Sequence, residues 1–155
     1  MGLIIMEGFL TDFSKADFTS SRQHMFYDYW LEIKGDRLMP SRSDFSPFRL
    51  PRVLSSIIMV DVFRDPLRFK CRLMGTECVN AAGFDPTGQW VDEIANTDKI
   101  LERYQWLVDN KKPYFSSDNV EWANKNFKSF TSINCPFSTD GENVDLMIAS
   151  SIYRA

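Results

Sequence analysis

The residues from 68 to 88 change pattern twice, and this change limits the folds that the chain can adopt. Apolar and basic side chains first alternate in the order Phe69, Lys70, Cys71, Arg72, Leu73. This two-residue period is typical of a strand with one buried face. The alternation ends at Gly75, and small apolar residues then lead to a turn between Gly83 and Gly88. A strand, a short helical segment and a glycine-bounded loop are therefore predicted in succession.

A second apolar run precedes this strand. Residues 57 to 63 are apolar except for Asp61 and rich in β-branched side chains, as expected of a strand buried on both faces. Residues 64 to 67 contain Asp65-Pro66, a turn short enough to fold the two strands into a hairpin.

The clearest helical pattern follows the glycine-bounded loop, and Asn96, Thr97 or Asp98 can cap it. Its apolar side chains share one stripe: Ile100, Leu101, Tyr104, Leu107 and Val108. Its polar face is expected to carry Lys99, Glu102, Arg103 and Asp109. Lys111-Lys112-Pro113 should end the helix, because proline cannot continue it.

The last third of the chain is predicted to be three strands, over residues 114 to 122, 127 to 137 and 144 to 153. Residues 123 to 126 and 138 to 143 are plausible hairpin connections. Two strands, a helical middle and three more strands can form one antiparallel five-stranded sheet with the helices on one face. The predicted class is α+β.

The N-terminal part reads differently. Residues 1 to 19 have no clear period, and we expect a loosely ordered arm. Ser20 and Gln23 form a capping-box pattern that opens a helix, which Gly35 ends. Its aromatic stripe, Phe26, Tyr29, Trp30 and Ile33, can pack on the open face of the sheet and can also pair with a second copy. Met25, Tyr27 and Leu31 lie off this stripe and extend the predicted dimer interface. We divide the chain into the arm and flanking helix, residues 1 to 35, and a domain over residues 36 to 155.

The central segment RFKCRLMGTECVNAAGFDPTGQWVDEI resembles the signature of stand-alone bacterial PAS-like domains. The resemblance extends over residues 27 to 154 and implies the PAS fold and a sensory or regulatory role, without naming a ligand. Within the similar PSRSDF segment, Arg42 and Asp44 are expected to form a structural salt bridge or cap. Ser46-Pro47 should then open a short helix or turn that Pro51 limits.

Any ligand pocket should lie between the concave side of the sheet and the helix predicted over Lys99 to Asp109. Polar residues within apolar elements are the candidate ligand-binding residues: Asn80, Tyr104, Thr131, Asn134 and Ser151. Each can instead be hydrogen-bonded to the protein's own backbone. Both faces of the later strands carry apolar residues, so the sequence does not identify the face that lines the pocket, and the cofactor stays unknown.

Composition argues against several classes of function. A net charge of −3 without a basic block disfavours nucleic-acid binding, and no apolar run approaches the roughly 20 residues that span a bilayer. We therefore expect a cytoplasmic protein without a membrane partner. Cys71, Cys78 and Cys135 lack Cys-x-x-Cys spacing, which favours buried thiols over disulfides or a metal site.

Catalysis has little support in the sequence. The single histidine, His24, is expected outside the pocket, which disfavours a nucleophile–histidine pair and a histidine-ligated haem. The Asn-Cys-Arg-Phe-Leu motif of flavin photosensors in the PAS family is also missing. No catalytic residue is predicted.

Two main functions compete at this stage. The first is a ligand-responsive signalling module that acts through a signalling partner or a homodimer. The second is a protein-interaction scaffold without a ligand. A small cavity-based enzyme is a third possibility, and it would need an acid or base in the pocket, for which Asp61 and Asp145 are the candidates.

Overall fold

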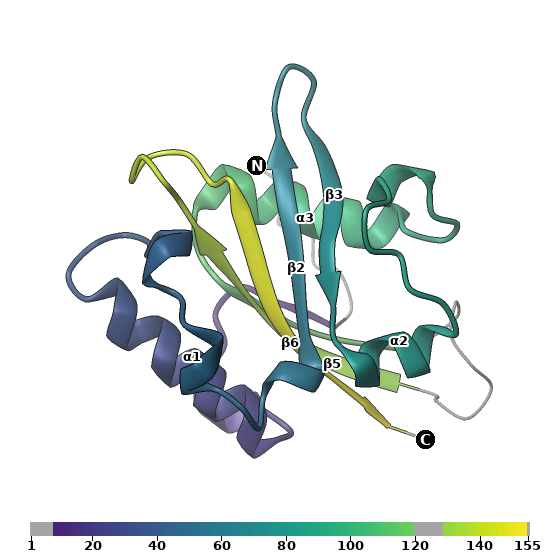
Figure 1. Ribbon diagram of the computed structural model, residues 1–155, viewed down its shortest axis with the longest axis horizontal. Coiled ribbons are helices and arrows are strands. Elements are labelled where there is room, and N and C mark those ends of the chain that lie inside the picture. The colour runs from purple at the N-terminus through teal and green to yellow at the C-terminus, as the bar shows by residue number, and fades with distance from the viewer. Residues whose placement is uncertain (1–7, 120–128, 155) are drawn as a thin grey trace.

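The computed structural model describes residues 8 to 119 and 129 to 154 (Figure 1). One antiparallel sheet has the strand order β1-β4-β5-β6-β2-β3. The strands are β1 (Phe9–Leu10), β2 (Ile57–Phe63), β3 (Arg68–Met74), β4 (Tyr114–Asn119), β5 (Ser129–Phe137) and β6 (Leu146–Arg154). The helices are α1 (Ser21–Lys34), α2 (Thr76–Ala82) and α3 (Asp98–Asn110). The α+β class and the five predicted strands are confirmed.

The sixth strand, β1, corrects the prediction of a loosely ordered arm. Its two residues pair with β4, Phe9 opposite Ser116 and Leu10 opposite Phe115. The Phe9 ring packs edge-on against Trp106 and Tyr114, with centroids at 5.5 and 5.1 Å. Two residues are too few to show a strand period, so the sequence carries no pattern for this element.

The hairpin and the short helix form where they were predicted. β2 and β3 are joined by residues 64 to 67, and α2 follows Gly75 directly. Gly83 and Gly88 have φ angles of +83° and +87°, a region that glycine adopts without strain. The predicted connection over residues 123 to 126, with the strand residues 120 to 122 and 127 to 128, lies outside the described residues.

Helix α1 begins and ends as its capping residues predict. The Ser20 hydroxyl accepts a hydrogen bond from Arg22 N at 3.2 Å, and Gly35 ends the helix at φ +57°. The capping box itself is altered, because the Gln23 side chain accepts from Thr19 N at 2.9 Å instead of from Ser20 N. Trp30 Nε1 donates to Pro136 O at 3.0 Å, which fixes the helix across β5.

The segment between α1 and β2 has the structural role predicted for its ionic residues. Asp44 accepts from Ser41 N at 2.9 Å and pairs with Arg37 at 2.8 Å. These bonds lower the pKa of Asp44. Arg42 donates to Phe45 O at 3.1 Å. A short 3-10 turn, Pro47–Arg49, opens after Ser46 as expected.

The helices divide between the two faces of the sheet (Figure 1). α1 packs against β5 and β6 on one face, where Phe26 and Trp30 join a closed apolar core. α3 lies across the opposite face, against a second cluster that includes Leu107 and Met147. The prediction that the aromatic helix covers the open face of the sheet is confirmed.

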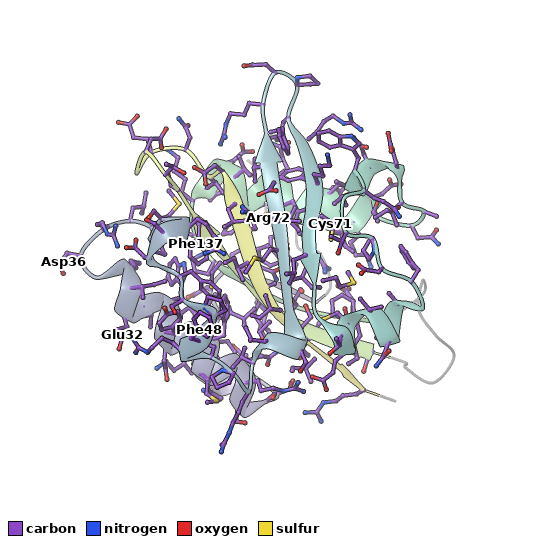
Figure 2. The ribbon with its side chains drawn as sticks, in the orientation of Figure 1. Glu32, Asp36, Phe48, Cys71, Arg72 and Phe137 are labelled. Atoms are coloured by element: carbon purple, nitrogen blue, oxygen red, sulfur yellow. The ribbon has the colours of Figure 1, made fainter. Side chains whose placement is uncertain are left out.

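Strand alternation sends neighbouring side chains to different environments. Phe137 of β5 has no exposed area and belongs to the core, whereas Phe48, in the turn Pro47–Arg49, is 92% exposed; both are labelled in Figure 2. On β3, Cys71 is buried, and its neighbour Arg72 pairs with Asp61 at 3.3 Å on the outer side. All three cysteines are buried free thiols, as predicted.

Within the described part of the chain, no helix combines the length and the apolar character needed to cross a membrane.

Candidate functional site

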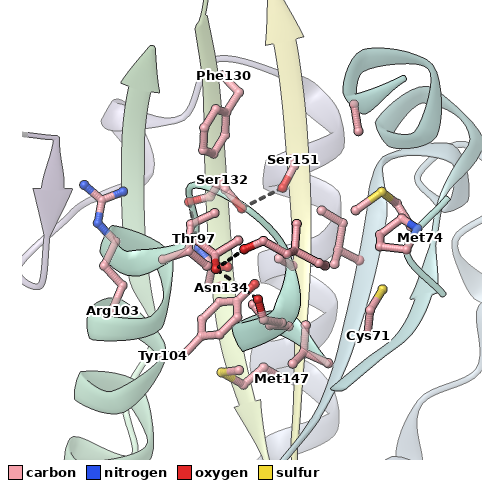
Figure 3. Close-up of a pocket in the computed structure, with 18 of the residues that line it drawn as sticks. Cys71, Met74, Thr97, Arg103, Tyr104, Phe130, Ser132, Asn134, Met147 and Ser151 are labelled. Carbon is pink, nitrogen blue, oxygen red and sulfur yellow. Dashed lines mark hydrogen bonds between the residues drawn. The ribbon is translucent and has the colours of Figure 1, made fainter. Parts of the chain in front are cut away.

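A cavity of about 580 Å³ lies on the α3 face of the sheet (Figure 3). Strands β2 to β6 supply its floor, and α2, the loop after it and α3 supply its walls. In Figure 3, Arg103 stands at one side of the cavity and Cys71 and Met74 at the other.

The floor of the cavity carries two rows of residues that face one another across three strands. Tyr114, Asn134 and Ala149 are register partners in one row, and Ser116, Ser132 and Ser151 are partners in the next. The Ser132 and Ser151 hydroxyls are hydrogen-bonded at 2.8 Å, and Asn134 Nδ2 donates to Ser132 O at 3.2 Å. We call Ser116, Ser132, Asn134 and Ser151 the polar floor.

The remaining lining is mainly apolar. We call it the apolar wall: Ile58, Val60, Met74, Ala82, Phe84, Pro86, Val91, Ile94 and Ile100. Thr97 holds part of this wall in place, because its hydroxyl contacts Val91 O and Ile94 O, both at 2.9 Å. A concave apolar surface with a few convergent polar groups is the usual form of a small-molecule site.

Two tyrosines also line the cavity, Tyr104 on α3 and Tyr114 on β4. Each carries one hydroxyl group. Neither forms a hydrogen bond with any other described residue. Burial raises the pKa of both hydroxyls above the ordinary value of 10.0. Burial also raises the pKa of the Cys71 thiol to about 11. All three groups are therefore protonated and uncharged at neutral pH.

The prediction that Arg103 lies on the polar face of α3 is wrong. Its side chain lines the cavity and is only 1% exposed. The guanidinium forms a two-point ion pair with Asp118 of β4, with one contact at 3.2 Å, and stacks over the Phe9 ring at 5.7 Å. The spacing from Ile100 to Arg103 to Leu107 places the arginine on the inner stripe, but its partner Asp118 lies in a separate strand and gives no local signal.

Three of the five predicted ligand-binding residues line the cavity: Tyr104, Asn134 and Ser151. Asn80 lines a separate recess of about 220 Å³, together with Arg22 and Glu77. Thr131 lies on the α1 face, where its hydroxyl meets Gln23 Nε2 at 3.0 Å and the Thr19 hydroxyl at 2.6 Å.

The carboxylates considered for catalysis lie elsewhere. Asp61 pairs with Arg72, and Asp145 accepts a hydrogen bond from Thr139 N at 2.7 Å. Among the residues that the structure places around the cavity, none is aspartate, glutamate or histidine, and Arg103 is the one charged side chain. His24 packs against Phe18 on the α1 face. The described residues also form no group of three metal-ligating side chains.

The residues predicted for a dimer interface divide in two. Phe26, Tyr29 and Trp30 are at most 7% exposed and belong to the chain's own core, so they present no surface to a second copy. Ile33 is half-buried against the same core, and Met25 remains 39% exposed. Phe26, Tyr29 and Trp30 are therefore core residues of this chain. Dimerisation itself stays a prediction.

Comparison with known proteins adds one match. A family model described as a PAS domain matches residues 18–107, more than half of the 155-residue chain. No curated protein and no solved structure matched the chain. The match, together with the antiparallel sheet and its helices, shows that the chain belongs to the PAS domain family.

Proposed function

We propose that this chain is a sensory module that binds a small molecule in the cavity on the α3 face. The PAS family consists generally of sensory and signalling modules, which are typically not catalytic. The cavity is the observation that supports ligand binding here. Its volume of about 580 Å³ falls within the 300–1,000 Å³ common for small-molecule sites, and its lining combines an apolar wall with a polar floor.

The same face argues against a ligand-free scaffold. In a scaffold without a ligand, the protein's own side chains would fill this space. The large residues expected to do so are Phe69, Leu73, Tyr104 and Phe137. Phe69 and Tyr104 do pack together, with ring centroids at 5.3 Å, but Tyr104 still borders the cavity. Leu73 is 42% exposed, and Phe137 belongs to the opposite core.

Binding can be tested by native mass spectrometry of the full chain. We expect purified protein to carry a small molecule, or to take one up from a metabolite library, with a mass that is lost on unfolding. Ala149→Leu places a larger side chain in the cavity and should reduce occupancy. Ala16→Leu, on the exposed turn Lys15–Asp17, is the matched control and should leave occupancy unchanged. A wild-type chain that stays empty under all these conditions would contradict the proposal.

We propose that α1 transmits the effect of ligand binding, either to a signalling protein or to a second copy of the chain. α1 packs against β5 and β6, and the other face of these two strands forms part of the cavity floor. Met25 and Leu31 are 39% and 37% exposed on α1 and provide an apolar contact that does not belong to the core. Light scattering at tens of micromolar should show a dimer for the wild type and a monomer for Met25→Ser/Leu31→Ser. A monomeric wild type would leave a heterologous partner as the output.

A further inference from the structure

We propose that the ligand of this cavity is an uncharged, amphipathic compound with a hydroxyl, phenol or amide group at one edge. The inference rests on the proposed function, that the cavity binds a small molecule. It adds the chemical class of that molecule, which follows from the charges and hydrogen-bonding groups around the cavity.

Charge is the first restriction. Arg103 is the one charged side chain that the structure places on the lining, and Asp118 already neutralises it. An anionic ligand would have to draw the guanidinium away from Asp118, whose side chain is only 11% exposed. Removing one partner of a buried ion pair is strongly unfavourable. Lys99 lies 3.6 Å from Asp118, but its side chain is 60% exposed. It would therefore replace the charge of Arg103 only from the solvent side.

A cationic ligand meets the opposite difficulty. No carboxylate borders the cavity in the described part of the chain, so a buried cation would lose its hydration without gaining a counter-charge. The hydroxyls of Tyr104 and Tyr114 and the thiol of Cys71 do not supply one, because burial raises their pKa and keeps them protonated.

The hydrogen-bonding edge is the second restriction. Tyr114 is 2% exposed and lines the cavity, and its hydroxyl has no hydrogen-bond partner among the described residues. Its register partner Asn134 uses Nδ2 for Ser132 O, which leaves Oδ1 to accept. The lining of the cavity therefore offers a hydroxyl donor and an amide acceptor from neighbouring strands. Hydroxyl, phenol and amide groups match this pair because each can accept and donate at once, and a buried polar group left unpaired is unfavourable.

The rest of the ligand faces the apolar wall. Ile94 and Ile100 lie on the α3 side of the cavity, and Phe84 and Pro86 lie in the loop after α2. These side chains favour a hydrocarbon or aromatic body, since burying apolar surface is the main source of affinity in such sites.

Four compounds that share one ring system test this class: 2-naphthol, naphthalene, 2-naphthoate and naphthalen-2-ylmethylammonium. Their dissociation constants for the full chain can be measured by calorimetry or competition at neutral pH. We expect 2-naphthol to bind most tightly. Naphthalene should bind about tenfold more weakly, which corresponds to one lost hydrogen bond, and both ions should bind more weakly than naphthalene.

Two variants locate the hydrogen bond. Tyr114→Phe should reduce 2-naphthol to nearly the affinity of naphthalene and leave naphthalene unchanged. Thr131→Val, on the same sheet but facing α1, should leave the order of all four compounds unchanged. If either ion bound as tightly as 2-naphthol, the inferred class would be overturned while the sensory function stood. If none of the four bound, the inference would also be overturned, and native mass spectrometry would judge the function separately.

Discussion

The two faces of the sheet are built from the same strands but differ in what they enclose. On the α1 face, β5 contributes Ile133, Cys135 and Phe137, all with no exposed area, to a closed apolar core. On the α3 face, the alternate residues Ser132 and Asn134 line a cavity. Large apolar side chains fill one side, whereas the small or polar residues Ser132, Asn134, Ala149 and Ser151 border the space on the other. The comparison shows that the site arises from side-chain size and polarity, because the backbone is common to both faces.

On the closed face, polar side chains of α1 also reach the backbone of the sheet, and one of these contacts lies next to the cavity. Gln23 of α1 has no exposed area, and its Nε2 donates to Thr131 O at 3.2 Å. Thr131 immediately precedes Ser132 of the polar floor. α1 is therefore hydrogen-bonded to the strand residue next to the cavity.

The largest expected effect separates the closed core from the cavity. Phe137→Ala should lower the free energy of unfolding by about 3–5 kcal/mol, because it removes a fully buried ring and leaves a void in the core. Phe84→Ala, in the apolar wall and 39% exposed, should lower it by clearly less. Chemical denaturation of both variants measures the difference, and equal losses would contradict the contrast between the two faces.

The ion pair at the edge of the cavity should have an effect of similar size. Arg103→Met removes one partner of a buried pair and should destabilise the fold by about 3–5 kcal/mol. The double variant Arg103→Met/Asp118→Leu should recover much of this loss, because it leaves no uncompensated buried charge. A double variant no more stable than Arg103→Met would show that Asp118 is not the partner that matters.

Enlarging an alanine should have a smaller effect on stability, and this effect should differ between a packed position and a position beside the cavity. Ala81 of α2 has no exposed area, and Ala81→Leu should cost about 1–3 kcal/mol by overpacking. Ala149→Leu adds the same atoms beside the cavity and should leave stability nearly unchanged. Thermal denaturation can compare the two, and an equal loss for Ala149→Leu would indicate that the cavity does not accommodate extra atoms.

The smallest effect concerns the link between α1 and α2. Glu77 accepts from the Ser55 hydroxyl and pairs with Arg22, and these contacts lower its pKa below the ordinary 4.5. A lowered pKa means that the stabilisation is present above pH 4.5 and is lost as the pH falls through the folded-state value. Because Glu77 is about half-exposed, the effect should be below about 1 kcal/mol. Glu77→Gln should flatten this part of the stability profile, whereas Glu32→Gln, which removes an exposed pair with Arg49, serves as the control.

Much of the fold could be predicted from periodicity and capping. The alternation after Arg68, the apolar stripe of α3 and the Ser20 cap identify elements because each depends on neighbours in the sequence. β1 could not be predicted, since its two residues have no period and depend on β4.

The site was predictable only in part, because its geometry depends on distant partners. Tyr104, Asn134 and Ser151 were found as polar residues within apolar elements. Thr131 has the same local appearance, but it faces Gln23, a residue 108 positions away in the sequence. From the sequence alone, Arg103 is predicted to lie on the exposed face of α3. Its burial depends on the ion pair with Asp118, which lies in another element. Which face of a strand is inward depends on the helix that covers it.

Thiol labelling tests most directly whether one face is hollow and the other closed. Cys71 lines the cavity and Cys135 lies in the α1 core, and both are at most 3% exposed. Peptide mapping after treatment with methyl methanethiosulfonate can follow each cysteine in the folded chain, with rates normalised to those in denaturant. We predict that Cys71 reacts at least about tenfold faster than Cys135 and that bound 2-naphthol slows Cys71 alone. Equal normalised rates, or a faster Cys135, would contradict the presence of an accessible cavity on the α3 face.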